Sequence, residues 1–323
     1  TTPQDLRCIK TQPPTHSTMK VIVATVLALL IAVMAEDPQV LDSYMINKIN
    51  SMNGVMWKAG ENEIFKGMKM SQIKNRLGAF LPMRETDNTP RFEVQGDFNA
   101  PDSFDSYKNW PQCAHPVRDQ AQCGSCWAFS ASEALSDRRC ISTGDSSSPI
   151  LSPQDMVSCD HSDYGCRGGY LTNAWKYLEQ TGIVTDKCMP YKSGSGFVPS
   201  CPTTCDNPSD AFTKYKVKSG STKHFSSVAA AEQDIVANGP IQVGFMVYQD
   251  FFSYKSGIYH HVSGGLAGGH AVLITGWGVQ NGEKYWIVKN SWSQTWGNSG
   301  FFWIRKGVNE CSMEDQMFAG VPL

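Results

Sequence analysis

Cys126 combines a reactive side chain with a position at the start of a predicted helix. The residues that follow it recur with the spacing of one helical face, which predicts a helix over Cys126–Arg139. At the first turn of a helix, free backbone N–H groups and the positive end of the helix dipole favour a thiolate over a thiol. Because a thiolate attacks carbonyl carbon readily, residue type and position together indicate a nucleophile.

Three further residues could complete a site for attack on a carbonyl group. His270, in the glycine-rich run Gly268–Ala271, could donate a proton to the leaving group. Asn290 could hydrogen-bond the imidazole and hold its tautomer. Gln120 could join the backbone N–H of Cys126 in an oxyanion hole, where two donors stabilise the developing negative charge. The four residues together favour acyl transfer through a covalent intermediate.

Each of these residue types also has a plainer interpretation. An isolated cysteine in a secreted chain is usually half of a disulfide, and an isolated histidine is usually a surface or core residue. Cys126, His270 and Asn290 differ because they occur in combination with a helix start and with Gln120. The other histidines have no such context, and we interpret five of them as structural: His115, His161, His224, His260 and His261.

Composition and charge exclude some partners and indicate a compartment. In 323 residues, 30 acidic and 28 basic side chains give a formal charge of −2, so we expect no nucleic-acid partner. Eleven cysteines are too many for a reducing cytosol and indicate either disulfides or a metal site. Because that number is odd, at least one thiol stays unpaired.

The first 35 residues have the features of a targeting segment. An apolar run over residues 21–34 follows Met19, and it is too short to span a bilayer but typical of a signal peptide. Small residues predict cleavage after Ala35. We therefore expect residues 1–18 to be a leader or translation artefact and residues 19–35 to be a signal peptide, with no stable membrane anchor. The alternative for the apolar run is a buried core helix.

Residues 36–98 contain no cysteine and have the features of a removable propeptide. The stripe formed by Met45, Ile49, Met52 and Met56 predicts an amphipathic helix, and a second helical stretch is expected over Glu63–Leu77. Glycines and prolines after that stretch predict an extended, cleavable linker. A small N-terminal domain is the alternative interpretation.

Residues 99–323 form a body that changes character near its middle. Helical patterns dominate about 113–207, whereas β-rich runs punctuated by glycine dominate about 208–310. Such a succession predicts an α+β architecture, with a cleft between a helical lobe and a β lobe as the place for a site.

The body resembles the papain family of cysteine peptidases, and within it the cathepsin B subgroup. The resemblance covers residues 100–323 and rests on the following motifs: Gln120–Trp127, Gly165–Gly169, Val247–Tyr248, Tyr259–Val262 and Asn290–Gly297, with Trp57–Gly60 in the propeptide. It implies a papain-like two-lobed α+β fold, with a helical left lobe, a β-barrel-like right lobe and chain termini that cross between them.

The resemblance also implies roles for residues of the site. Cys126, His270, Asn290 and Gln120 match the family's catalytic positions. Gly168 and Gly169 match the strand that binds the substrate backbone on the unprimed (acyl) side. Trp292 matches the residue that covers the triad and lines the first subsite on the primed (leaving-group) side.

By resemblance, eight cysteines form four disulfides: Cys113–Cys140, Cys123–Cys166, Cys159–Cys201 and Cys188–Cys205. Cys126 and Cys311 are then the free thiols of the body. A zinc site is the competing interpretation for four cysteines, although they lack paired C-x₂-C knuckles: Cys159, Cys166, Cys201 and Cys205. We expect neither metal nor cofactor.

Two departures from the subgroup affect the expected specificity. Cathepsin B-like enzymes remove dipeptides with the help of an occluding loop that carries adjacent histidines, but the corresponding stretch Met189–Ser200 is short and contains no histidine. We therefore expect an endopeptidase. The S2 position that often carries glutamate is Gln316, and a neutral amide pairs poorly with a guanidinium, so we expect more use of apolar P2 residues.

The leading hypothesis is a cysteine endopeptidase made as a zymogen, acting through an acyl-enzyme thioester. Its partners would be peptide and protein substrates, its own propeptide as inhibitor, and cystatin-like inhibitors, and it would be a monomer. Expected locations are the secretory pathway, a lysosome or lysosome-like vacuole, or the extracellular space. Two alternatives are a catalytically silent binding or matrix protein and an acyltransferase or transglutaminase-like enzyme.

Overall fold

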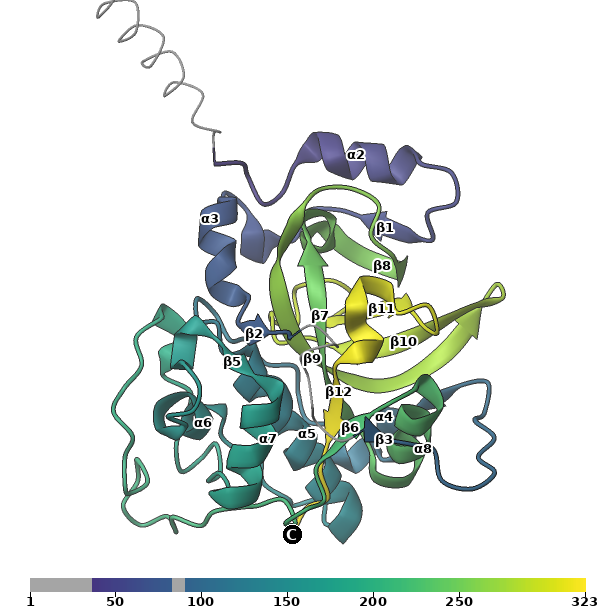
Figure 1. Ribbon diagram of the computed structural model, residues 1–323. Coiled ribbons are helices and arrows are strands. Elements are labelled where there is room, and N and C mark those ends of the chain that lie inside the picture. The colour runs from purple at the N-terminus through teal and green to yellow at the C-terminus, as the bar shows by residue number, and fades with distance from the viewer. Residues whose placement is uncertain (1–36, 83–90) are drawn as a thin grey trace, which may run out of the picture. The chain divides into compact units, whose positions relative to one another are not determined.

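The structure is a computed structural model that describes residues 37–82 and 91–323 (Figure 1). The leader and signal peptide expected over 1–18 and 19–35 lie outside the described residues. Residues 39–323 form one compact unit. Below, residues 39–82 are called the N-terminal segment and residues 99–323 the body. No helix within the described residues is long and apolar enough to cross a membrane.

Three helices dominate the first half of the body, drawn in teal in Figure 1: α5 (Cys126–Thr143), α6 (Pro153–Cys159) and α7 (Leu171–Gln180). Helix α5 confirms the helix expected over Cys126–Arg139, and α6 and α7 lie within about 113–207, where helical patterns were expected. Helix α6 begins where the Ser152 side chain accepts the N–H of Asp155, and α5 ends at Gly144, whose φ of 63° suits glycine. Helix α5 is buried on nearly all sides, between α6, α7 and the strands, so its first residue is fixed inside the molecule.

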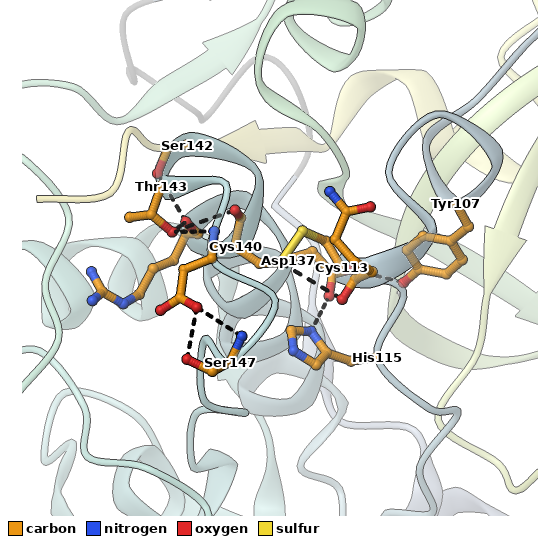
Figure 2. Close-up of a disulfide and its surroundings, with 11 residues drawn as sticks. Tyr107, Cys113, His115, Asp137, Cys140, Ser142, Thr143 and Ser147 are labelled. Carbon is orange, nitrogen blue, oxygen red and sulfur yellow. Dashed lines mark hydrogen bonds and ion pairs between the residues drawn. A yellow bond between two sulfur atoms is a disulfide. The ribbon is translucent and has the colours of Figure 1, made fainter.

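A disulfide and a buried carboxylate anchor the chain to the middle of α5 (Figure 2). Cys113 is joined to Cys140 on α5. One turn earlier, the fully buried Asp137 accepts the hydroxyl of Tyr107 at 2.7 Å and faces Nδ1 of His115 at 2.6 Å. His115 therefore has the structural role that the sequence indicated.

The second half of the body is built on a ten-stranded sheet, which confirms the expected α+β class. Its main path runs β1-β8-β11-β10-β9-β7-β12-β6-β3, and β4 pairs with β9 off this path. The two end strands of this path, β1 (Trp57–Ala59) and β3 (Arg91–Phe92), precede the body in the chain. Helix α8 (Val228–Asn238) packs beside this sheet. The strands of the body are β4 (Phe104–Asp105), β6 (Lys223–Phe225), β7 (Ile241–Tyr248), β8 (Tyr254–Tyr259), β9 (Leu266–Gln280), β10 (Glu283–Lys289), β11 (Phe301–Arg305) and β12 (Met317–Ala319).

The first helix of the N-terminal segment, α2 (Ser43–Ser51), is shorter than the apolar stripe predicts. Met45 and Ile49 are buried as expected, but Met52 ends the helix in an extended conformation and Gly54 has a φ of 80°. The prediction was wrong for Met52 and Met56, because the chain turns there to enter the strand β1 (Trp57–Ala59).

The helix expected over Glu63–Leu77 is broken into three pieces. These are the 3₁₀ turn η1 (Glu63–Phe65), the helix α3 (Met70–Ile73) and the 3₁₀ turn η2 (Lys74–Arg76). Gly67, with a φ of 73°, interrupts the helical path between the first two. With this break, Phe65 and Arg76 are both buried, and the Arg76 guanidinium lies over the Phe65 ring.

Short strands join the residues before the body to the body itself. Strand β1 extends the sheet at β8, β2 (Ala79–Phe80) pairs in parallel with β5 (Gly169–Tyr170), and β3 (Arg91–Phe92) pairs in parallel with β6. The indole N–H of Trp57 also donates to the carbonyl of His260 at 3.0 Å. The N-terminal segment is therefore held by backbone pairing at both β8 and β5.

Candidate active site

Cys126 is the first residue of α5, and its sulfur faces backbone N–H donors. The N–H groups of Trp127, of Ala271 and of Cys126 itself are directed at the sulfur. Ser125 precedes the helix without capping it, because its hydroxyl bonds to that of Tyr191 at 2.8 Å instead. The N–H groups of the first turn thus remain available to a sulfur anion, as expected from the sequence.

His270 lies on β9, directly before Ala271, and its ring is held by Asn290. Nε2 of His270 is 2.8 Å from Oδ1 of Asn290, which also accepts the N–H of Ser291. An amide oxygen only accepts, so this contact places the imidazole proton on Nε2. Nδ1 is buried and has no hydrogen-bond partner among the described residues, which leaves it as the nitrogen able to take a proton from a thiol.

Trp292 covers the histidine. Its indole stacks on the His270 ring with centroids 4.5 Å apart, and both side chains are fully buried. Phe65 of the N-terminal segment meets the same indole edge-on at 5.4 Å. The indole therefore separates the histidine–asparagine hydrogen bond from solvent, which strengthens that bond.

The side-chain amide of Gln120 is buried and hydrogen-bonded at both ends. Its Nε2 donates to the carbonyl of Arg76 at 2.9 Å and to that of Cys123 at 2.8 Å. Its Oε1 accepts the hydroxyl of Ser291 at 2.7 Å, which fixes the orientation of the amide. A carbonyl oxygen of the N-terminal segment thus contacts the donor expected to stabilise an oxyanion.

Gly78 of the N-terminal segment lies against the nucleophile. Its N–H is directed at the sulfur of Cys126, and its carbonyl accepts the N–H of Gly169 at 2.9 Å. A Cβ added to Gly78 would lie 1.9 Å from the carbonyl oxygen of Gly124, so only glycine fits here. The N-terminal segment therefore covers the thiol and pairs with the strand β5, which begins at Gly169 directly after Gly168.

Leu81 of the N-terminal segment fills a hollow over two glycines of the body. A Cβ added to Gly244 would lie 2.4 Å from Cδ2 of Leu81, and one added to Gly269 would lie 3.2 Å from its Cγ. Gln316 borders the hollow, since its Nε2 donates to the carbonyl of Pro82 at 3.2 Å. Gln316 thus contacts the N-terminal segment, and its place in the S2 pocket stays a prediction.

The cover changes the expected charge state of the pair. Burial raises the pKa of Cys126 to about 11, more than the backbone N–H groups lower it. Burial also lowers the pKa of His270 to about 4, although the hydrogen bond to Asn290 raises it. The expectation of a thiolate is therefore not met with the N-terminal segment in place: thiol and imidazole are both neutral, because water is excluded.

All four disulfides that the resemblance implied are present. They are Cys113–Cys140, Cys123–Cys166, Cys159–Cys201 and Cys188–Cys205. The alternative of a zinc site at Cys159, Cys166, Cys201 and Cys205 is wrong, since each of these sulfurs is in a disulfide. Cys126 and Cys311 are the free cysteines of the described residues, and these residues contain no cluster of three potential metal ligands.

The adjacent histidines of the body lie outside the site. Nδ1 of His261 is 3.1 Å from the carboxylate of Asp250, and its ring stacks on Tyr248. His260 accepts the indole N–H of Trp57 through its carbonyl. Both residues are structural, as expected.

Sequence reasoning missed the residues that orient Gln120. The hydroxyl of Tyr191 donates to the Gln120 carbonyl at 2.8 Å and contacts Ser125, so it links the two ends of the loop before α5. Ser291 fixes the amide itself. A tyrosine in a long irregular stretch gives no sequence signal for this role, whereas Ser291 could have been suspected from its place beside Asn290.

Comparisons with known proteins agree with this geometry. Residues 100–321 match the model of the papain family cysteine proteases. The chain is 40% identical over 299 residues to cathepsin B-like CP2 of Giardia intestinalis, covering 90% of this chain and 97% of that protein. It is 38% identical over 338 residues to cathepsin B-like cysteine proteinase 4 of Caenorhabditis elegans, with 93% and 97% covered.

A solved structure supports the same assignment. Procathepsin B S9 from Trypanosoma congolense superposes with a TM-score of 0.82 at 34% sequence identity. The match covers 88% of this chain and all of that one, whose name denotes a proform. The chain therefore belongs to the papain family of cysteine proteases and is a cathepsin B-like member with a papain-like α+β fold.

Proposed function

We propose that the protein is a cysteine endopeptidase that acts through a Cys126–His270 thiolate–imidazolium pair. Nδ1 of His270 takes the thiol proton, and the thiolate attacks the scissile carbonyl carbon. The C–N bond then breaks as the imidazolium protonates the leaving amine, which leaves a thioester on Cys126. Water, deprotonated by the same imidazole, hydrolyses the thioester. Gln120 and the Cys126 N–H stabilise the oxyanion in both halves.

The observation that carries this proposal is the hydrogen bond between Asn290 and His270, which determines the nitrogen of the imidazole that is free to take a proton. Asn290 accepts from Nε2 of His270 and leaves Nδ1 without a partner among the described residues, and the N–H of the next residue, Ala271, is directed at the Cys126 sulfur. Such an arrangement suits transfer of one proton between sulfur and imidazole.

Residues 36–98 are proposed to be a propeptide, with the mature enzyme starting at 99. In support, Gly78 covers the Cys126 sulfur and the Arg76 carbonyl occupies the amide of Gln120. Both contacts exclude a substrate carbonyl from the same places. Low pH or proteolysis would release the segment and expose the cleft.

The endopeptidase assignment depends on the stretch Met189–Ser200. This stretch lies against the loop before α5 through the hydroxyl of Tyr191 and through Gly194, whose carbonyl accepts the N–H of Gln122 at 2.8 Å. The side-chain oxygen of Gln154 also accepts two backbone N–H groups of this stretch. Because these bonds are made to the body, we expect the stretch to keep its position and to leave the primed side open when the N-terminal segment is removed.

The proposed preference for apolar P2 residues is supported by Leu81, the apolar side chain that fills the hollow beside Gln316. Leu81 fills it, and the neutral amide of Gln316 donates to a backbone carbonyl rather than facing a cation. We expect substrates with leucine or valine at P2 to be cleaved faster than those with arginine. Gly168, Gly169 and Trp292 would bind the substrate backbone and the first leaving-group residue.

The proposed setting is the secretory pathway, a lysosome-like vacuole or the extracellular space. Four disulfides form and persist in oxidising compartments, which supports this assignment. The proposed partners are peptide and protein substrates, the propeptide and cystatin-like inhibitors, and the enzyme would act as a monomer.

A peptide-library digest with activated enzyme tests the proposal. We expect internal cleavage at sites whose P2 residue is apolar, and labelling of Cys126 by an epoxide thiol inhibitor. Cys126→Ala should show neither cleavage nor labelling. Release of mainly C-terminal dipeptides from long peptides would overturn the endopeptidase assignment. Cleavage that persists in Cys126→Ala would overturn the mechanism.

A further inference from the structure

Arg76 of the N-terminal segment shows which side chain the region around Asp119 accepts. Its Nη1 lies 3.3 Å from Oδ1 of Asp119, and its guanidinium sits over the ring of Phe65 at 5.7 Å from the centroid. The side chain is only 6% exposed, whereas that of Asp119 is 41% exposed. A cation is thus already seated between a carboxylate and an aromatic ring beside the active site.

Asp119 lies beside two residues of the proposed site. It directly precedes Gln120 and forms an isolated β-bridge with Trp292. Phe65, which flanks the Arg76 guanidinium, packs against the same indole. Since Trp292 is proposed to line the first leaving-group subsite, the Asp119 carboxylate lies at the primed side of the cleft.

The carboxylate is held in place by the body. Its Oδ1 accepts the N–H of Ala121 at 2.8 Å, in a turn where Ala121 has a φ of 53°. The neighbouring cation Arg118 is directed at Asp186, with Nη2 and Oδ1 2.7 Å apart, and at the ring of Phe129. The carboxylate of Asp119 therefore keeps its position when Arg76 leaves, while Arg118 stays engaged elsewhere.

We propose that Asp119 is a specificity-determining residue that selects arginine or lysine in the leaving-group half of the substrate. This inference rests on the proposed peptidase function and concerns the same site. After the N-terminal segment is removed, a cationic side chain at P1′ or P2′ takes the place of the Arg76 guanidinium. Arginine gains more than lysine, because its planar fork matches a carboxylate.

The test compares internally quenched peptides that differ only in having arginine or its neutral isostere citrulline at P1′ or P2′. For activated wild-type enzyme we expect kcat/KM to favour arginine by about fivefold at one of the two positions, the size expected of a partly exposed ion pair. Raising the ionic strength to about 1 M should reduce that ratio, since the Debye length shrinks to about 3 Å.

Substitutions separate this role from a structural one. Asp119→Asn keeps an oxygen for the Ala121 N–H and should lower the ratio to about one, while cleavage of the citrulline peptide stays within about twofold of wild type. Asp119→Glu should retain a preference. As control, Asp210→Asn removes a carboxylate that pairs with the exposed Lys187 and should leave the ratio unchanged.

Three results would overturn the inference: a wild-type ratio of one at both positions, an unchanged ratio in Asp119→Asn, or equal loss of both peptides in that variant. None of these results would contradict the peptidase proposal; in this experiment, that proposal fails if the wild-type enzyme does not cleave the citrulline peptide. Titration of active sites with an epoxide inhibitor normalises all rates to folded enzyme.

Discussion

Of the two free thiols of the described residues, Cys126 is buried and Cys311 is half-buried, and the groups around them favour opposite protonation states. Burial raises the pKa of Cys126 to about 11, and it raises the pKa of Cys311 further. Around Cys126 the polar neighbours are N–H donors, which favour a thiolate. Around Cys311 they are the carboxylates of Glu310 and Asp250, which disfavour one.

The origin of the shielding also differs between the two thiols. Part of the cover of Cys126 is Gly78, which belongs to the N-terminal segment and can be removed with it. The neighbours that raise the pKa of Cys311 belong to the body and stay in place. A latent nucleophile thus needs N–H donors that belong to the body and a covering segment that can be removed. Cys311 has neither the donors nor a removable cover.

Removing each sulfur in turn gives the largest expected contrast. Cys126→Ala should lower kcat/KM by about 10⁴-fold or more, because no other group can form the thioester. Cys311→Ala should leave kcat/KM within about twofold and lower the free energy of unfolding by about 1 kcal/mol, through lost packing. Peptide hydrolysis and thermal unfolding measure the two effects. Comparable loss of activity in both variants would show that the comparison is wrong.

Gly78→Ala tests whether the cover of Cys126 is removable. The added Cβ would meet the Gly124 carbonyl at 1.9 Å, so the segment must shift away from the thiol. Overpacking of this kind costs about 1–3 kcal/mol, which predicts labelling of Cys126 in the full chain by an epoxide inhibitor about 10- to 100-fold faster than in wild type.

Gly67→Ala is the matched control in the same segment. Its added Cβ has no atom within 4 Å, so only the local turn is strained. Labelling of Cys126 in this variant should stay within about threefold of wild type. Equal acceleration in both variants would mean that general destabilisation of the segment, rather than the contact at Gly78, exposes the thiol.

A smaller effect is expected at Cys311. Its sulfur lies 3.6 Å from Oε1 of Glu310, and the carboxylate raises the pKa of the thiol. Glu310→Gln removes that charge, so alkylation of Cys311 at pH 9 should become a few-fold faster. Glu283→Gln is the control, because it removes the same charge from a different residue. Mass spectrometry of the Cys311 peptide gives the rate. No change would show that burial alone keeps this thiol inert.

Much of the site could be predicted from the sequence because its chemistry lies in local motifs. The helix start at Cys126, the glycine-flanked His270 and the block around Asn290 each identify their own residue type and element. The four disulfides followed from resemblance, since sequence spacing alone leaves many pairings open.

The rest depended on contacts between segments that are distant in sequence. One such contact is that of Gly78 with the buried sulfur of Cys126, and no local pattern reveals that a glycine will meet a thiol in another part of the chain. The helix expected over Glu63–Leu77 is broken for the same reason: Phe65 packs on the Trp292 indole and Arg76 lies beside Asp119, and this packing overrides helical propensity.

The central claim is that the N-terminal segment holds Cys126 as a neutral thiol and that its removal releases a thiolate. The most direct test is the rate of Cys126 alkylation by iodoacetamide as a function of pH, followed by mass spectrometry of the Cys126 peptide. The full chain is compared with the same protein after the segment has been removed by limited proteolysis.

In the full chain, alkylation should be slow at neutral pH and rise with a midpoint near the pKa of about 11. After removal, water returns to the site, and the N–H donors and the His270 imidazolium lower the pKa of the thiol. The account therefore predicts fast alkylation that persists well below pH 7. Identical pH profiles before and after removal would contradict it.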